Sequence, residues 1–447
     1  MTKVFISQHV LTPVGIRPAA VIVDGEKIVG LRELHEIPPN VETVDCGRYA
    51  LLPGLVDAHT HINEPGRTDW EGFETGTMAA AAGGFTTLID MPLNCLPATT
   101  TVAALEAKRN AASGKCMVDW CAWGGISEHN TEHLELLAAN GVRGFKCFLA
   151  DPGIDGFARV DEAELRTAAK HIVRTGLPLL THAELPGPIQ LAGVTLTQAD
   201  WRKYGTWLAS RPDEAEIEAI RLMLGLSEEY GFRLHIVHLA TAYAIPDLCR
   251  ARERGVRVTI ETCPHYLHFA AETIPDGSTL HKCAPPIRSA ANREALWEAL
   301  KEGVIDLIGT DHSPCPPTLK RLNDGNFQTA WGGIASLSVA LPAVWSGMRI
   351  RGFNLGDLAR WMSANPAALA SIDHHKGAIA EGRDADLVVF DPDREIGVVA
   401  EGLHTRHLVS PYLGERMYGK VLATWLRGEQ VFVDGKFPSS CRGREVR

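Results

Sequence analysis

The chain has 447 residues, of which 45% are hydrophobic and 22% charged, a composition typical of a folded globular protein. Its length exceeds one ordinary compact domain and suits one large barrel with a smaller second domain. The 54 acidic residues outnumber the 44 basic ones, and the resulting net charge of −10 argues against a surface for nucleic acid or an anionic membrane.

The sequence shows no signal for export or membrane insertion. No charged segment followed by an apolar core occurs near the N-terminus, and no apolar run approaches membrane-spanning length. The ten cysteines include no Cys-X-X-Cys pair, so in a chain of this length they are expected to be reduced thiols. We therefore expect a cytoplasmic protein.

The two ends of the chain are predicted to be rich in β-strands. Strand-like runs cover residues 4–7, 20–23, 27–31, 385–392, 422–427 and 430–435, with turn residues between them. Because the termini of a domain often lie close together, segments 1–52 and 376–447 are predicted to form one small β-sandwich domain.

The middle of the chain, residues 53–375, is predicted to form a (β/α)8 barrel, an α/β fold. Apolar runs rich in β-branched residues end near His61, Met91, Trp123, Phe148, His182, His238, Cys263 and Asp311. The predicted helices include 75–82, 213–230 and 292–301, each followed by a glycine. This alternation favours a barrel over a doubly wound open sheet, and no Gly-X-Gly-X-X-Gly follows the first strand to indicate dinucleotide binding.

One connection between a strand and a helix is longer than the others. Residues 183–212 separate His182 from the next clear helix, passing through Trp201. Long connections after barrel strands lie over the active-site face and often act as lids. We therefore expect this stretch to be a loop that covers the site.

Two histidines stand at the end of the first barrel strand. His59 and His61 are two residues apart, so their side chains share one face of a strand. Imidazole is the commonest protein ligand for divalent transition metals. Taken alone, the pair is more often two buried histidines with ordinary hydrogen bonds, so the prediction of a metal site depends on other strands.

Four further ligand-capable residues lie at the ends of other predicted strands. They are Lys146, His182, His238 and Asp311. Each of them alone has an ordinary structural explanation, but six such groups at matching depth on five strands indicate a metal site. The set exceeds the three protein ligands of a mononuclear catalytic zinc, so two metal ions are expected.

Lys146 is the unusual member of this set, because an ammonium group has no lone pair for a metal. Burial and nearby metal charge would depress its pKa and leave a neutral amine. Reaction of that amine with carbon dioxide would give a carbamate, a carboxylate that bridges two cations. Zinc is the expected metal, and the ligands also suit cobalt, manganese or iron.

Together these residues resemble those of the binuclear cyclic amidohydrolases, the family of dihydroorotases, hydantoinases and allantoinases. The resemblance covers nearly the whole chain and implies that carboxylated Lys146 bridges the two metals. It implies that one metal is held by His59, His61 and Asp311, and the other by His182 and His238. It also implies that Asp311 acts as general acid and base on a nucleophilic hydroxide bridging the metals, and that the protein is a homotetramer.

Two positions distinguish the branches of this family. Dihydroorotases have a carboxylate-binding arginine where this chain has Asn63, and hydantoinases typically have a tyrosine where it has Asp151. The runs 61–73, 90–94 and 145–148 resemble those of allantoinases. The resemblance therefore implies hydrolysis of the cyclic amide of allantoin to allantoate, in purine degradation.

Three alternatives to this reading remain open. A hydantoinase or dihydropyrimidinase activity would use the same centre, and a non-enzymatic scaffold could have the same fold. A mononuclear deaminase-type barrel would lack Lys146. Asn63, Asn94, Cys283 and Ser313 are the candidate contacts to a neutral substrate, together with segment 282–286, although Asn94 could simply form a turn and Ser313 a helix cap.

Overall fold

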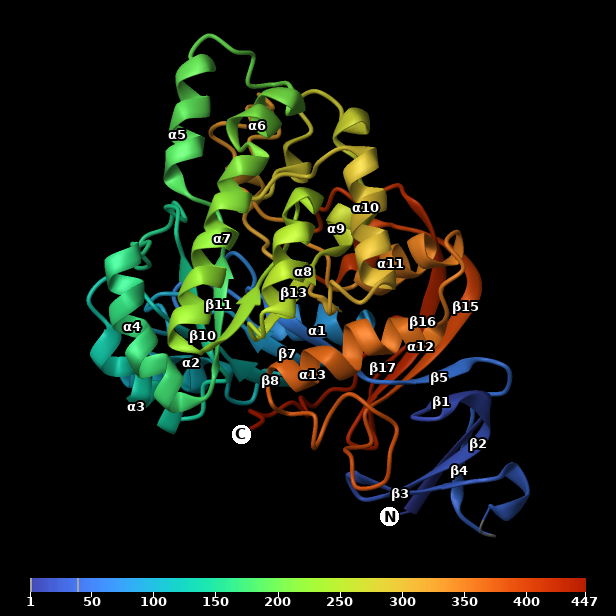
Figure 1. Ribbon diagram of the computed structural model, residues 1–447. Coiled ribbons are helices and arrows are strands. Elements are labelled where there is room, and N and C mark those ends of the chain that lie inside the picture. Colours follow the sequence, from blue (N-terminus) through green and yellow to red (C-terminus); the bar gives the residue numbers. More distant parts are fainter. Residues whose placement is uncertain (1, 38–39) are drawn as a thin grey trace.

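The computed structural model describes residues 2–37 and 40–447 (Figure 1). Both ends of the chain contribute strands to one eight-stranded sheet. Its members are β1 (Thr2–Thr12), β2 (Gly15–Asp24), β3 (Lys27–Arg32), β4 (Glu42–Asp45), β5 (Ala50–Pro53), β15 (Leu387–Gly397), β16 (Arg416–Leu426) and β17 (Glu429–Val433). The order is β17-β16-β15-β5-β1-β2-β3, and β4 also pairs with β1.

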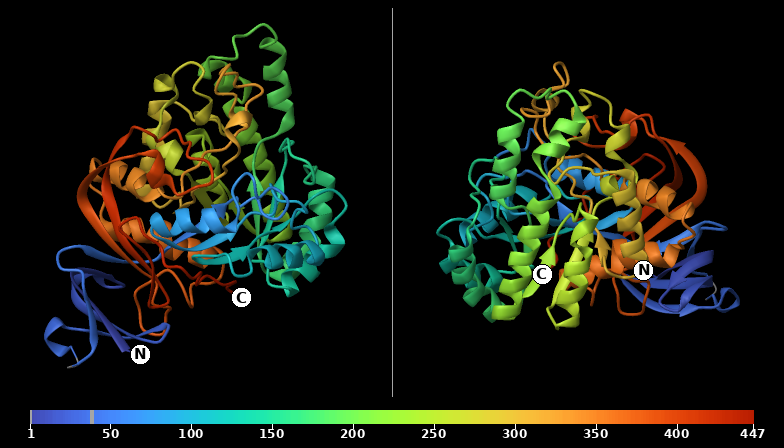
Figure 2. Two further views of the ribbon diagram at one scale, coloured as in Figure 1. Left: turned by 180° about the vertical axis from the view of Figure 1, so that it is seen from behind. Right: turned by 45° about the horizontal axis from the view of Figure 1, so that its top comes forward.

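The predicted association of the two chain ends is confirmed by antiparallel pairing of β5 with β15. The sheet is curled. Phe5 of β1 contacts Trp425 of β16 edge-to-face, with ring centroids 4.9 Å apart, although two strands lie between β1 and β16 in the sheet. Buried residues from both ends form one apolar cluster inside this curl. The N-terminal strands lie beside the barrel at one side of the molecule (Figures 1 and 2).

The predicted barrel is confirmed, with eight parallel strand positions. They are β6 (Leu55–Thr60), β7 (Phe85–Asp90), β8 (Asp119–Ala122) continued by β9 (Gly124–Gly125), β10 (Phe145–Phe148), β11 (Pro178–His182), β12 (Arg233–Ile236), β13 (Val258–Thr262) and β14 (Leu307–Ile308). A parallel bridge between Thr60 and His312 joins the first strand to the last. The carboxyl ends of all eight strands therefore meet at one mouth.

Helices surround this barrel. They are α1 (Phe73–Ala82), α2 (Val102–Ala112), α3 (Leu134–Ala139), α4 (Glu162–Thr175), α5 (Pro186–Thr195), α6 (Tyr204–Ser210), α7 (Asp213–Tyr230), α8 (Ile245–Glu253), α9 (Pro264–His268), α10 (Ala290–Lys301), α11 (Ala340–Arg349), α12 (Leu355–Ala359) and α13 (Asn365–Leu369). The three helices predicted from sequence correspond to α1, α7 and α10. Helix α7 ends at Gly231, whose φ of 78° is the left-handed conformation that glycine adopts without strain.

The prediction of a helix-free loop over 183–212 is wrong, because this segment contains α5 and α6. Helix α5 has no buried residue among its ten, and its apolar side chains Leu191 and Val194 are 74% and 71% exposed. A helix without a buried face lacks the apolar period by which helices are recognised. In Figures 1 and 2, α5 stands at the periphery of the molecule. Trp207 of α6, in contrast, is buried and lines the cavity at the barrel mouth.

A buried ionic cluster joins the terminal sheet to the barrel. The Lys376 Nζ atom lies 2.7 Å from an oxygen of Asp119 and 2.9 Å from oxygens of Asp384 and Asp386. Arg427 also binds Asp119. Burial alone would lower the pKa of Lys376, but the three carboxylates outweigh it and raise that pKa. Each charge in this buried cluster is therefore stabilised by the opposite charges beside it.

Lys376→Met is expected to lower the free energy of unfolding by about 3–5 kcal/mol, because it leaves buried carboxylates without their shared cation. Urea unfolding followed by circular dichroism measures the change. Lys301→Met is the matched control, because Lys301 forms an exposed pair with Glu298 and its loss is expected to cost less than about 1 kcal/mol. Equal costs for the two variants would contradict the prediction.

Candidate metal centre

The first set of donor atoms lies where strands β6 and β14 end. His59 Nε2 is 3.3 Å from an Asp311 carboxylate oxygen, and His61 Nε2 is 3.4 Å from the same oxygen. Donor atoms of the three residues lie within 4.8 Å of one another, and all three residues are buried. The His61 amide donates to the carbonyl of His312 over 2.8 Å, which holds the two strand ends together. These three residues form a metal-binding cluster.

Polar side chains hold the two histidines in place. The His59 Nδ1 atom lies 2.6 Å from a carboxylate oxygen of Glu261, a residue of β13. This places the proton on Nδ1 and leaves Nε2 as the ligand atom. The Asn94 side-chain amide hydrogen-bonds His61 Nδ1 over 3.2 Å.

The second pair of histidines adjoins the first set. His182 Nδ1 and His238 Nε2 are 2.9 Å apart, and the rings of His59 and His238 stack with centroids 5.3 Å apart. The His182 Nε2–H donates to Glu184 over 2.7 Å, so the lone pair of Nδ1 faces His238. Burial lowers the pKa of His61, His182 and His238, which favours the neutral form that ligates metals.

Lys146 lies below the histidines on β10 and is fully buried. Within the described part of the chain, its Nζ atom has no hydrogen-bond partner. Burial lowers the pKa of Lys146 to about 8, although Glu261 and Asp311 act in the opposite direction. A buried amine without a partner is costly unless another group satisfies it. The lack of a partner for this atom is what is expected of a lysine whose amine carries a further group. The histidine and carboxylate donors around it are suited to a divalent metal ion.

A cavity of about 400 Å³ opens above these residues. Its wall includes His59, His61, Asn94, Phe148, Asp151, His182, Trp207, Arg211, His238, Lys282, Cys283, Asp311, Ser313, Gln328 and Trp331. The candidate contacts Asn94, Cys283 and Ser313 therefore face the site.

Asn63 lies outside this wall. It is buried with a φ of 66°, and its side-chain amide donates to the carbonyl of Pro314 over 3.2 Å. The left-handed backbone turns the side chain toward the loop after β14. The side chain of Asn63 thus contacts a neighbouring loop and is not part of the cavity wall.

Several residues around the site were not predicted from the sequence. Glu184 follows His182 at the same two-residue spacing as His59 and His61, and this spacing could have revealed it. Glu261 is the one charged residue of β13, which is itself a signal for a functional group. Trp207 and Arg211 lie in segment 183–212, for which the sequence predicts a loop.

Lys282 forms part of the cavity wall, and within the described residues its partners are backbone carbonyls and an aromatic ring. Its ammonium donates to the carbonyls of Ala330 and Gln328 over 2.5 and 3.2 Å, and lies 4.3 Å from the ring centroid of Trp207. Burial, with Lys320 and Arg211 nearby, lowers the pKa of Lys282 to about 7. The lysine thus connects α6 to the loops above the site.

Lys282→Met is expected to remove a pH dependence of stability. Between pH 7 and 10.5 the unfolded chain binds more protons at this lysine than the folded one, because its folded-state pKa is about 7 and its ordinary value 10.5. The free energy of unfolding of the wild type therefore rises with pH in this window relative to the variant, by at most about 1.4 kcal/mol per pH unit. Urea unfolding across the window measures this rise, and parallel pH dependences would contradict it.

The fold and the metal-binding cluster define a metal-dependent hydrolase of the barrel type. Comparison with known families agrees: the model of the amidohydrolase family matches residues 50–431, and the chain belongs to this family. No helix in the residues that the structure describes is long and apolar enough to cross a membrane.

Similar proteins narrow the assignment within the family. The allantoinase of Streptomyces avermitilis is 47% identical, over 96% of this chain and 95% of its own length. The allantoinase of Arabidopsis thaliana is 43% identical, over 98% of this chain and 89% of its own. By sequence, the chain groups with the allantoinases.

Among solved structures, the fold is similar to those of hydantoinases. The L-hydantoinase (dihydropyrimidinase) from Arthrobacter aurescens has a TM-score of 0.93 at 29% identity, covering 99% of each chain. The dihydropyrimidinase from Brevibacillus agri has a TM-score of 0.91 at 28% identity, covering 100% of this chain and 98% of its own.

Proposed function

We propose that this protein hydrolyses the hydantoin ring of allantoin to give allantoate, at a centre of two divalent metal ions. The observation that carries the proposal is the convergence of His59, His61 and Asp311 beside the pair His182 and His238. The choice of allantoin as the substrate rests on the sequence similarity to allantoinases.

The donor atoms divide naturally into two sites. His59, His61 and Asp311 would hold one ion, and His182 and His238 the other. Lys146, carboxylated by carbon dioxide, would bridge them, and its orphaned Nζ atom supports this assignment. Zinc suits the histidine and carboxylate ligands best, and cobalt, manganese and iron suit them as well.

The reaction breaks the amide C–N bond of the ring and forms a C–O bond to a water oxygen. When bound, the two ions lower the pKa of that water and polarise the amide carbonyl. Burial alone would raise the pKa of Asp311, but His59 and His61 hold it below its usual range, so Asp311 is ionised. Asp311 accepts the proton of the attacking water and delivers it to the leaving ring nitrogen.

The cavity wall favours a neutral substrate over an anionic one. Its two cationic side chains already have protein partners: Arg211 pairs with Glu184, and Lys282 donates to two backbone carbonyls. Asn63 stands where dihydroorotases have a carboxylate-binding arginine. Asn94, Ser313 and the backbone near Cys283 are the proposed contacts to the ureide groups.

The test is a substrate panel of allantoin, hydantoin, dihydrouracil and dihydroorotate, with protein loaded with each of the four metals. We expect kcat/KM for allantoin to exceed the others by about 100-fold or more, the size of discrimination that specific hydrogen bonds provide. Turnover of hydantoin or dihydrouracil without allantoin activity would establish the hydantoinase alternative, which the structural neighbours favour. A non-enzymatic scaffold would bind no stoichiometric metal.

Two further properties belong to the proposal. A cytoplasmic location is supported by the ten cysteines, all of which are free thiols. Assembly into a homotetramer is implied by the family resemblance, and sedimentation velocity of the purified protein tests it.

A further inference from the structure

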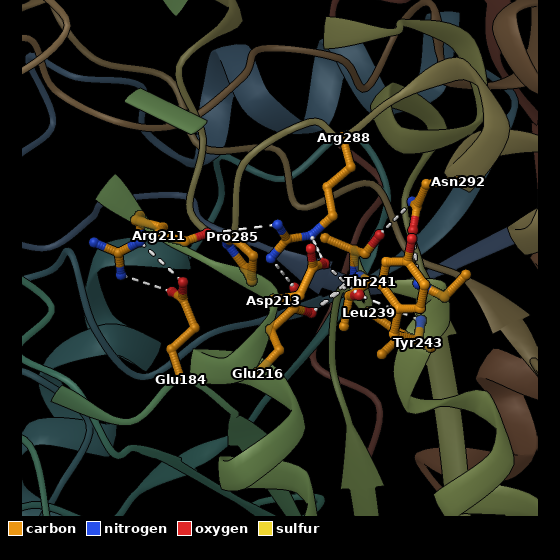
Figure 3. Close-up of polar contacts among 12 residues, drawn as sticks. Glu184, Arg211, Asp213, Glu216, Leu239, Thr241, Tyr243, Pro285, Arg288 and Asn292 are labelled. Carbon is orange, nitrogen blue, oxygen red and sulfur yellow. Dashed lines mark hydrogen bonds and ion pairs between the residues drawn. The ribbon is translucent and has the colours of Figure 1, made fainter. Parts of the chain in front are cut away.

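A buried polar network connects the loops that follow His182 and His238 (Figure 3). We call its four central residues the arginine scaffold: Glu184, Arg211, Glu216 and Arg288. They come from the loop after β11, the segment before α7, the first turn of α7 and the loop before α10.

The backbone after His238 is held by side chains from other elements. His238 has a φ of 38°, a left-handed conformation that a residue other than glycine keeps only where its surroundings impose it. One carboxylate oxygen of Glu216 accepts the amides of Ala240 and Thr241 over 3.0 and 3.3 Å. The Thr241 hydroxyl donates to Asp213 over 2.5 Å. The turn that presents His238 is thus fixed from α7.

Arg288 holds Glu216 in this position. Its Nη2 atom donates to the second oxygen of Glu216 over 2.8 Å, and its Nε atom lies 3.0 Å from Asp213. Its Nη1 atom reaches the carbonyl of Arg211 over 3.5 Å. Arg288 is only 6% exposed, so these charged contacts form in a poorly solvated environment. One guanidinium therefore joins the turn of His238 to the segment that carries Arg211.

The Arg211 side chain completes the connection to His182. Its Nε and Nη2 atoms donate to the two oxygens of Glu184 over 2.9 and 2.6 Å, a paired geometry that fixes the carboxylate. Glu184 accepts the Nε2 proton of His182 with an oxygen that Arg211 also binds. This contact sets the tautomer and the ring orientation of His182.

The first set of ligands depends on different contacts. Glu261 and Asn94 hold His59 and His61. The loop of Asp311 is fixed by Thr310, whose amide and hydroxyl donate to Asp57 over 2.9 and 2.5 Å. The hydrogen bonds of the arginine scaffold do not reach His59, His61 or Asp311. Glu261 is the shared element, because it also accepts the backbone amide of His238 over 3.1 Å.

We propose that Glu184, Arg211, Glu216 and Arg288 are positioning residues for the second metal ion alone, because they fix the tautomer of His182 and the turn that presents His238. This rests on the proposed binuclear function. The scaffold therefore makes the affinity of the second ion adjustable without a contact to the ligands of the first, while Glu261 supports both His59 and the backbone of His238.

The test compares metal affinity in the full-length protein and two variants. Arg288→Lys keeps the charge but loses the forked geometry that joins Glu216 to the Arg211 carbonyl. The double variant Glu184→Leu/Arg211→Met removes the acceptor of the His182 proton together with the cation that holds it, so neither member of this buried pair is left as an unpaired charge. Arg252→Lys is the matched control, because Arg252 pairs with Asp306 at the opposite end of the barrel wall. Chelator competition with zinc gives both dissociation constants.

We expect both scaffold variants to weaken the second zinc site by about 10–100-fold, with less than about a threefold change at the first. In manganese-loaded protein at limiting metal, the EPR signal of a coupled ion pair should give way to that of isolated ions. Thermal unfolding of the metal-free proteins separates a loss of folding from a loss of binding. The control should keep both wild-type affinities.

The proposal is overturned if the scaffold variants weaken both sites equally, weaken neither, or match the control. These outcomes leave the proposed function intact as long as the wild type opens allantoin. Conversely, a wild type that binds two ions with the expected response of the variants, but does not hydrolyse allantoin, refutes the substrate and not the scaffold. A wild type that binds a single ion refutes the second site and the scaffold together.

Discussion

Replacing Lys146 with alanine is expected to abolish ring opening, lowering kcat/KM for allantoin by about 10³-fold or more. The reason is that Lys146 is the residue proposed to bridge the two ions, and its amine has no hydrogen-bond partner among the described residues. Small carboxylic acids such as formate, acetate and propionate should restore part of the activity, because alanine leaves room for a carboxylate at the bridge.

Lys146→Met is the matched control for this rescue. The methionine side chain removes the amine but fills its space, so added acids should not restore activity. Steady-state assays with increasing acid, together with metal content per chain, measure both effects. Full activity and two bound ions in Lys146→Ala would show that the bridge assignment is wrong. Loss of activity in both variants without any rescue would leave Lys146 as a structural residue.

Asp311→Asn is expected to lower kcat by about 10²–10⁴-fold, the usual contribution of a positioned acid or base. Asparagine keeps the shape of the side chain but cannot carry the proton from water to the leaving nitrogen. Because the Asp311 oxygen is also within 3.4 Å of both His59 and His61, we expect weaker binding at the first metal site.

Asp306→Asn provides the comparison for this variant. Asp306 lies near the opposite end of the same strand, where it pairs with Arg252, so its substitution should affect stability and not kcat. Stopped assays at saturating metal separate the loss of the proton carrier from the loss of the ion. Near-wild-type kcat for Asp311→Asn under these conditions would remove Asp311 from the proton transfer.

Much of the fold could be predicted because it follows from local patterns. The eight apolar runs form the buried barrel strands. The range predicted for α7, residues 213–230, is also the range observed, because Gly231 marks the end of the helix in the sequence. Helices α5 and α6 could not be predicted in this way. In α5 the apolar residues face solvent, so its sequence has no period that distinguishes a helix from a loop.

The order of the residues alone predicts which side chains stand at the strand ends, because a strand alternates its faces and a parallel barrel brings those ends to one mouth. It thereby predicted six ligand-capable residues at one site, and the resemblance to the cyclic amidohydrolases implied their division into two metal sites. The residues that support these ligands are identified only by the folded structure. Glu261 and Arg288 lie far from their partners in sequence, and their charges are satisfied by contacts between separate elements, which no local pattern encodes.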